Sequence, residues 1–231
     1  MTGWERYLRL IAAHPELVDA PPDGSGIRIL TDTETMLAEQ ARLRAAGSAV
    51  VETEFGVLSE DPWLIVLRDL VEFPDGRRNG YTRVVNRKTL EGGQGGVCIL
   101  PVHQGRIVLL RHYRHPPRAF LWEVPRGFGE QGVSMEENVR RELREEVGAE
   151  VLRLVSMGLG LPDSGVLRGK ANFVFAEIEA PAPRGEAADV DGIVAQRLVT
   201  PSELERMIVA GEIVDVFTIT AYALAKMRGL I

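Results

Sequence analysis

The spacing of apolar residues changes along the chain, and the change predicts where helices give way to strands. In residues 1–47 apolar side chains recur at intervals of three and four, which is typical of amphipathic helices. Two such stripes flank a turn-rich segment at residues 20–24: Trp4, Tyr7, Leu8 and Ile11, then Met36, Leu37, Ala41 and Leu43. We therefore expect a helical N-terminal extension over residues 1–47, which carries no catalytic pattern.

Residues 48–91 have the pattern of β-strands. Runs rich in β-branched and aromatic residues lie at 63–67 and 81–85, and Pro74-Asp75-Gly76 between them is a strong turn signal. We expect an antiparallel β region here. A single copy of the chain would cover the edge of such a region poorly, so we also expect it to support a homodimer.

Residues 92–231 alternate short strands with helices, which predicts one α/β domain. Gln104-Gly105 is expected at the tip of a hairpin between strands 97–102 and 107–111. The remaining elements expected here are strands at 171–178 and 193–199, a helix capped at Thr200, and a last helix over 215–227.

One predicted helix carries the strongest chemical pattern in the chain. Ser134, followed three residues later by Glu137, is a capping box, and Gly148 is placed to end the helix. An apolar stripe anchors one face in a core: Met135, Val139, Leu143 and Val147. Three carboxylates occupy the neighbouring arc of the same helix: Glu142, Glu145 and Glu146.

Crowding these carboxylates costs about 0.2–0.5 kcal/mol for each exposed pair, so their concentration needs a reason. A hard divalent cation is one, because Mg²⁺ prefers oxygen ligands and is commonly held by a few carboxylates together with substrate phosphates. The alternative from these residues alone is a solvated helix laced with salt bridges to the interleaved Arg140, Arg141 and Arg144.

The segment around this helix resembles the Nudix hydrolase signature, G-x5-E-x7-R-E-U-x-E-E-x-G-U, where U is aliphatic. The matching positions are Gly127, Arg141, Glu142, Leu143, Glu145, Glu146 and Gly148. Two positions depart from it, because Val133 replaces the first glutamate and Ala149 the last aliphatic residue. In the family that first glutamate pairs with the signature arginine, so the departure concerns the support of Arg141, for which Glu137 is a candidate.

The order of the other motifs resembles the ADP-ribose pyrophosphatase branch of that family. The resemblance rests on residues 111–114 (Arg-His-Tyr-Arg), 121–127 (Leu-Trp-Glu-Val-Pro-Arg-Gly), Pro162 and 211–215 (Gly-Glu-Ile-Val-Asp). It implies a Nudix α/β/α sandwich with a mixed sheet, preceded by the helical and antiparallel β extension. It also implies metal-dependent hydrolysis of ADP-ribose to AMP and ribose 5-phosphate.

The same resemblance implies roles for particular residues. More than one Mg²⁺ or Mn²⁺ ion would be held by Glu142, Glu145 and Glu146, with a backbone carbonyl at Arg126 or Gly127. The catalytic residues would be Glu142 and Glu145, together with Asp189 and Asp191 from an acidic loop. The substrate would be bound by Arg111, Arg114, Glu123, Trp63 and Pro162. For the two arginines, the alternative from the residues alone is a basic strand end that faces water.

Composition narrows the remaining function classes. The net charge of −6 over 231 residues argues against nucleic acid or an anionic membrane surface as partner. No apolar run approaches the roughly 20 residues of a membrane helix. Cys98 is the only cysteine, so no intrachain disulfide is possible, and we expect a cytoplasmic protein.

Two other functions stay open. The enzyme could act on another Nudix substrate, such as GDP-mannose, a dinucleotide or a nucleoside triphosphate. A protein of another class, a sensor that binds a nucleotide sugar without turnover, is disfavoured because a pure binder does not need all three glutamates.

Overall fold

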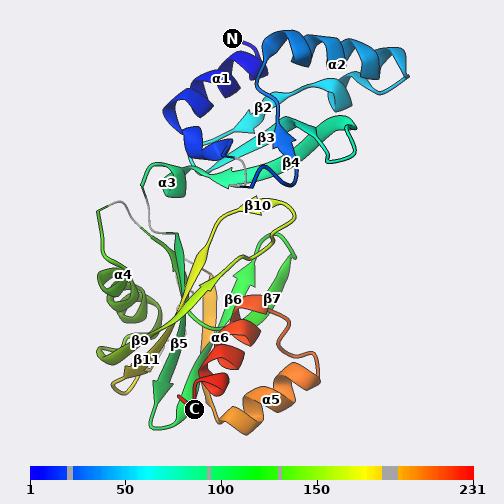
Figure 1. Ribbon diagram of the computed structural model, residues 1–231. Coiled ribbons are helices and arrows are strands. Elements are labelled where there is room, and N and C mark those ends of the chain that lie inside the picture. Colours follow the sequence, from blue (N-terminus) through cyan, green and yellow to red (C-terminus); the bar gives the residue numbers. More distant parts are fainter. Residues whose placement is uncertain (20–22, 93–94, 130–131, 184–191) are drawn as a thin grey trace. The chain divides into compact units, whose positions relative to one another are not determined.

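The computed structural model describes residues 1–19, 23–92, 95–129, 132–183 and 192–231. The chain divides into two compact units. The N-terminal unit comprises Met1–Glu91 together with Asp163–Arg168, and the C-terminal unit comprises Gly92–Pro162 and Gly169–Ile231 (Figure 1). Within the described residues, no helix is both long and apolar enough to cross a membrane.

Two capped helices and a small sheet build the N-terminal unit. Thr2 and Asp32 each accept a hydrogen bond from the first turn of the helix that follows. The helices are α1 (Gly3–Ala13), α2 (Thr33–Ala45) and the short α3 (Arg87–Leu90). The strands are β1 (Arg28–Ile29), β2 (Gly56–Glu60), β3 (Leu64–Glu72), β4 (Arg78–Asn86) and β10 (Leu167–Arg168).

The central hairpin of this sheet joins β3 to β4 through the predicted turn, with Glu72 opposite Arg78 and Gly76 at φ 81°. The sheet has the order β1-β3-β4-β10, with β2 also paired to β3. Trp4 and Tyr7 of α1 pack with Ile65 and Leu67 of β3 in one core. The contribution of β10, which pairs parallel to β4, does not follow from the sequence pattern.

A seven-stranded mixed sheet forms the C-terminal unit, with the order β12-β6-β5-β11-β9, β7 on β6 and β8 on β5. β5 and β11 are parallel, and the other pairs are antiparallel. The strands are β5 (Gly96–His103), β6 (Arg106–Arg114), β7 (Ala119–Glu123), β8 (Arg126–Phe128), β9 (Val151–Gly160), β11 (Ala171–Ile178) and β12 (Ile193–Val199). The tip of the β5–β6 hairpin is Gln104-Gly105, at φ 47° and 75°.

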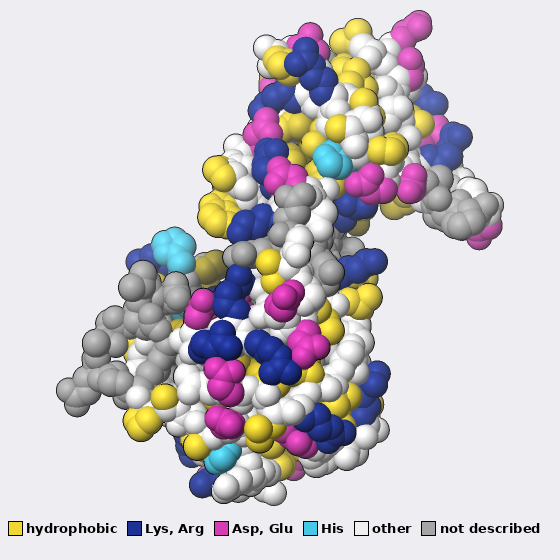
Figure 2. All heavy atoms as spheres, turned by 90° about the vertical axis from the view of Figure 1, so that its left-hand side faces the viewer, with side chains coloured by type: hydrophobic (Ala, Val, Ile, Leu, Met, Phe, Trp, Pro, Cys, Tyr) yellow, Lys and Arg dark blue, Asp and Glu magenta, His cyan; other side chains and the backbone are white. Residues whose placement is uncertain are grey.

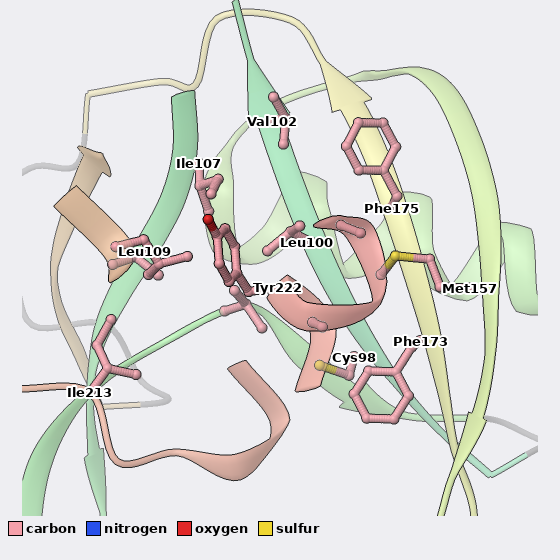
Figure 3. Close-up of a cluster of buried hydrophobic side chains, with 14 of the residues drawn as sticks. Cys98, Leu100, Val102, Ile107, Leu109, Met157, Phe173, Phe175, Ile213 and Tyr222 are labelled. Carbon is pink, nitrogen blue, oxygen red and sulfur yellow. The ribbon is translucent and has the colours of Figure 1, made fainter. Parts of the chain in front are cut away.

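Helices cover both faces of this sheet (Figure 1). α4 (Met135–Glu142) lies on one face, and α5 (Pro201–Val209) and α6 (Val216–Met227) lie on the other. Strand alternation creates two cores, with Ile99 and Leu110 facing α4 while Leu100 and Leu109 face α6. Figure 3 shows Tyr222 of α6 inserted among the strand residues of the second core. The predicted α/β fold with a mixed sheet is confirmed.

The acidic helix differs from the regular helix that its periodicity predicts. α4 begins at the Ser134 capping box as expected but ends at Glu142, and Leu143–Val147 continue as a π-helix. Gly148 closes the segment in the left-handed conformation at φ 67°. The wider turn changes the angular spacing of the three glutamates, so they do not form the regular stripe expected from 3.6 residues per turn.

Candidate active site

Glu123, at the end of β7, is a buried carboxylate that lies among three basic side chains of the C-terminal unit. Its side chain accepts hydrogen bonds from Arg114 Nε at 3.0 Å and Arg126 Nη2 at 3.2 Å, and His112 Nδ1 lies 3.2 Å away. A second Arg114 nitrogen also donates, so that pair is a two-pronged fork. Burial alone would raise the pKa of Glu123, but the hydrogen bonds from His112 and Arg114 outweigh it and lower that pKa.

Gly127 of β8 packs directly against the carboxylate of Glu142. A β-carbon built on Gly127 would lie 2.2 Å from the Glu142 Cδ and Oε1 atoms, which is far too close. Only glycine therefore lets the α4 carboxylate approach the β8 backbone. Glu142 Oε1 also accepts a hydrogen bond of 3.0 Å from Arg141 Nη2.

Glu146, in the π-helical segment, lies near enough to Glu142 for the two negative charges to interact. Burial, and then the negative charge of Glu142, raise the pKa of Glu146 to about 8. The charge of Arg114 and the backbone N–H of Arg126 act on Glu146 in the opposite direction. Glu142 and Arg114 therefore lie near enough to Glu146 to act on its charge, and Glu142 packs against the β8 backbone at Gly127.

These two carboxylates suit a hard cation, because a charge between them would relieve the repulsion that raises the pKa of Glu146. Within the described ranges, however, no three Asp, Glu, His or Cys side chains are arranged to hold a metal ion. Glu145, the third expected ligand, is exposed to solvent. The residues therefore fit a metal at Glu142 and Glu146, whereas the full ligand set stays a prediction.

The outer surface of the acidic helix does carry the salt bridges weighed as the alternative. Arg140 donates to Glu136 at 2.8 Å, and Arg144 donates to Glu150 at 2.8 Å. Figure 2 shows basic and acidic side chains interspersed on the face of the C-terminal unit that bears α4. These salt bridges thus join exposed side chains, whereas the side chain of Glu142 is only 12% exposed.

Arg141 is supported differently from the sequence-based hypothesis. Its Nη2 atom donates to Asn138 Oδ1 at 2.5 Å, in addition to its bond to Glu142. Among the described side chains, the Glu137 carboxylate accepts instead from the Ser134 backbone N–H at 3.0 Å. The hypothesis that Glu137 supports Arg141 was therefore wrong, because Arg141 donates to Asn138 and Glu142, whereas the Glu137 carboxylate accepts from Ser134.

Arg111 and Arg114 do not act on the same face of the sheet. They are three positions apart in β6, so strand alternation directs them to opposite faces. The Arg111 guanidinium lies 5.6 Å from the Phe120 ring centroid and 6.0 Å from that of Trp122. Arg114 is the arginine that the structure brings to the glutamates.

The other predicted site residues are distributed between the two units. Trp63 belongs to the N-terminal unit, where it is 54% exposed and lies under the Lys88 ammonium at 4.6 Å. Pro162 lines a small, mainly apolar depression in the C-terminal unit together with Phe217. Asp189 and Asp191 lie outside the described residues.

Three site-associated residues were not assigned a role from the sequence. His112 is buried against Glu123, whereas Asp215 and Thr218 are buried at the start of α6. The Asp-x-x-Thr spacing was a usable signal for an N-cap, because an aspartate at that position accepts hydrogen bonds from the first turn. The contacts that these residues make with distant strands had no local sequence signal.

Comparison with known proteins places this geometry in context. The sequence model of the NUDIX domain matches residues 94–215, which is more than half of the chain. An ADP-ribose pyrophosphatase of Bacillus subtilis (strain 168) is 25% identical over 159 residues, covering 68% of this chain and 81% of that protein. The crystal structure of an ADP compounds hydrolase superimposes with a TM-score of 0.62 at 20% identity, over 76% of this chain and 93% of that chain.

Proposed function

The chain belongs to the NUDIX domain family and is a Nudix hydrolase, and from this premise we propose that it hydrolyses the diphosphate bond of ADP-ribose. The products would be AMP and ribose 5-phosphate, and a closely related nucleoside diphosphate sugar is the nearest alternative substrate. The observation that carries the proposal is the packing of Glu142 against the β8 backbone at Gly127, with Glu146 near enough to Glu142 and Arg114 for their charges to act on it.

Mg²⁺ or Mn²⁺, in more than one ion, is the proposed cofactor. When bound, the metal would neutralise charge on the diphosphate and lower the pKa of a water molecule. Glu142 and Glu146 would hold it, with Glu145 and a backbone carbonyl at Arg126 or Gly127 completing the ligands. Gly127 makes room for Glu142, and the burial of Glu146 strengthens its interaction with a cation.

Arg114 is the proposed phosphate-binding residue. A guanidinium carries five N–H donors in a fixed fork, and Glu123 uses only part of that set. The buried Glu123 therefore fixes the plane of Arg114 while leaving donors for a phosphate oxygen. Arg111, Trp63 and Pro162 are proposed as further substrate contacts. Asp189 or Asp191 is proposed to activate water.

We further propose that the protein is a cytoplasmic homodimer. Large apolar side chains are exposed on the described strands and turns of the N-terminal unit, including Trp63 at 54%, Leu64 at 42% and Tyr81 at 39%. A second copy covering them would remove this apolar surface from water. Light scattering at micromolar concentration tests the dimer, and a stable species of the 25.5 kDa monomer mass would contradict it.

A substrate panel tests the activity. ADP-ribose, GDP-mannose, a dinucleotide and a nucleoside triphosphate are each incubated with enzyme and Mg²⁺, and the products are separated by chromatography. We expect AMP and ribose 5-phosphate from ADP-ribose at the highest kcat/KM, and no product after chelation of the metal. Preferred cleavage of another compound would reassign the substrate, and binding without cleavage would support the sensor.

A further inference from the structure

The loop between β7 and β8 is fastened by a side chain from the opposite face of the sheet. The buried backbone N–H of Val124 donates to Thr218 Oγ1 of α6 at 3.0 Å. The next residue, Pro125, accepts a hydrogen bond of 3.0 Å from the Ile99 backbone N–H. Because Val124 is fully buried and β7 ends at Glu123, Thr218 supplies an acceptor where the strand ladder no longer does.

Thr218 is itself held by the residue that caps α6. Its hydroxyl donates to Asp215 Oδ2 at 2.7 Å, and its backbone N–H donates to the same oxygen at 2.9 Å. The hydroxyl hydrogen is therefore committed to Asp215, which leaves the oxygen lone pairs free to accept from Val124. Asp215 thus fixes the orientation of the Thr218 hydroxyl oxygen that accepts the hydrogen bond from Val124.

Asp215 also acts on the far end of the same loop. Its Oδ1 atom lies 3.7 Å from Arg126 Nη2, and the Arg126 guanidinium lies 4.7 Å from the Phe217 ring centroid. The first turn of α6 therefore contacts the loop both at Val124 and at Arg126.

The segment that α6 holds, residues 124–127, is also the segment that lies beside Glu142 and Glu146. Gly127 packs against the Glu142 carboxylate, and the neighbouring Arg126 backbone lies near enough to Glu146 to act on its charge. A displacement of the loop would therefore change the distance between the β8 backbone and both carboxylates. α6 can influence the α4 side of the sheet without touching it.

We propose that Asp215 and Thr218 are positioning residues of the metal site, which hold the Arg126–Gly127 backbone at the distance that Glu142 and Glu146 require. The inference rests on the proposed function only in that it takes this glutamate pair as the metal site. It assigns to the start of α6 a role beyond capping a helix.

The chain offers a matched control in the N-cap of α5. Thr200 Oγ1 accepts a hydrogen bond from the Glu203 backbone N–H at 3.2 Å, and the Glu203 carboxylate accepts one from the Thr200 backbone N–H at 2.7 Å. That capping box is closed within α5 and its first turn. Thr200→Val and Thr218→Val remove the same hydroxyl from two helix starts in one unit, but only the second disconnects the β7–β8 loop.

The test measures Mn²⁺ binding by electron paramagnetic resonance for the full chain and three variants, together with thermal unfolding. Removing a group that supports metal ligands typically weakens metal binding by about 10–100-fold, and we expect this for Thr218→Val. Thr218→Ser, which keeps the hydroxyl, should restore wild-type affinity. Thr200→Val should lower the unfolding temperature and leave Mn²⁺ affinity unchanged.

Hydrogen exchange of the Val124 amide provides a second readout. We expect faster exchange in Thr218→Val than in Thr200→Val, because only the first variant removes the acceptor. The inference is overturned if both valine variants bind Mn²⁺ like the wild type, if both weaken it equally, or if the wild type binds none. A wild type that binds Mn²⁺ but cleaves no ADP compound would refute the proposed function while this comparison still decides the inference.

Discussion

Among the described residues, the most deeply buried carboxylate of each unit lies among cations and hydrogen-bond donors, and the two are used differently. Asp69 in the N-terminal unit is 2% exposed and accepts from the Tyr7 hydroxyl at 2.6 Å and from Arg83 Nη2 at 3.0 Å. Glu123 in the C-terminal unit is 1% exposed and is surrounded by Arg114, Arg126 and His112.

The two carboxylates differ in how deeply their hydrogen-bonding partners are buried. Tyr7 is fully buried, and burial, reinforced by the charge of Asp69, raises its pKa. The Tyr7–Asp69 pair is therefore closed inside the protein and stabilises the packing of α1 on β3. The side chains of Arg114 and Arg126 are each 25% exposed, and they extend from Glu123 to the glutamates and to α6. A buried carboxylate with partly exposed partners can orient a site.

The largest expected effect tests whether chemistry is confined to the C-terminal unit. Glu146→Gln removes the charge from the proposed metal position but keeps the size of the side chain. We expect a greater loss of kcat than for Asp189→Asn, whose loss should stay within the roughly 10²–10⁴-fold of a positioned general base. Turnover of each purified variant is measured while the metal concentration is titrated.

The rise in unfolding temperature on adding metal should also distinguish the C-terminal unit from the environment of Asp69. Because a ligand that binds only the folded state stabilises it, Mn²⁺ should raise the unfolding temperature of the wild type. The increase should be smaller for Glu146→Gln and unchanged for Asp69→Asn. Wild-type turnover by Glu146→Gln at ordinary metal concentration would show that the metal assignment is wrong.

Substituting one tightly packed glycine in each unit gives the next test of the comparison between the units. A β-carbon on Gly127 would meet the Glu142 carboxylate at 2.2 Å, and one on Gly3 would meet the Val57 carbonyl oxygen at 2.5 Å. Misplacing a reacting group by about 1 Å can cost about 10²-fold in rate, so we expect a loss of that order for Gly127→Ala. Gly3→Ala should lower the unfolding temperature without changing kcat.

Gly169→Ala is the neutral control for these substitutions, because no atom lies within 4 Å of a β-carbon built there. The three variants are compared by steady-state kinetics and thermal unfolding. A kinetic defect in Gly3→Ala, measured on folded protein, would break the separation between the units.

Substituting the two buried carboxylates is a direct test of the comparison. Glu123→Gln should lower kcat/KM by about 10–100-fold, as expected for a group that orients site residues. Asp69→Asn should leave kcat unchanged but cost about 3–5 kcal/mol in the free energy of unfolding, because it breaks a buried ion pair. Urea unfolding and steady-state kinetics of both variants decide between these outcomes.

Both substitutions weaken a buried pair, so a loss of stability in Glu123→Gln alone does not distinguish them. The distinguishing result is the kinetic constant of the folded fraction. Equal kinetics in the two variants would mean that Glu123, like Asp69, only stabilises its unit.

Local sequence signals predicted much of the scaffold around these networks. The capping boxes at Ser134 and Thr200 mark helix starts that the structure contains, and the hairpin at Gln104-Gly105 has the positive φ angles that favour those residues. Each of these features is decided by neighbours within a few positions. The influence of Glu142 on Glu146 likewise acts across four positions, whereas Glu145 is exposed to solvent.

The features that the sequence did not predict depend on distant contacts. The π-helical end of the acidic helix has the same apolar periodicity as a regular helix, so the pattern could not distinguish them. β10 is two residues long, and it is a strand only because β4 pairs with it. The opposite directions of Arg111 and Arg114, by contrast, could have been deduced from strand alternation.

The smallest expected effect concerns Val133, where the family signature has a glutamate. Arg141 already donates to Asn138 at 2.5 Å and to Glu142 at 3.0 Å, so it does not depend on a carboxylate at position 133. Val133→Glu should therefore change stability or activity by no more than about 1 kcal/mol, as surface substitutions usually do. Kinetics and thermal unfolding of this variant are compared with those of Asn138→Ala, which removes an observed partner of Arg141. If Val133→Glu instead raised turnover a thousandfold, the natural site would be a weakened one, and the organisation around Glu123 would not be sufficient for full activity.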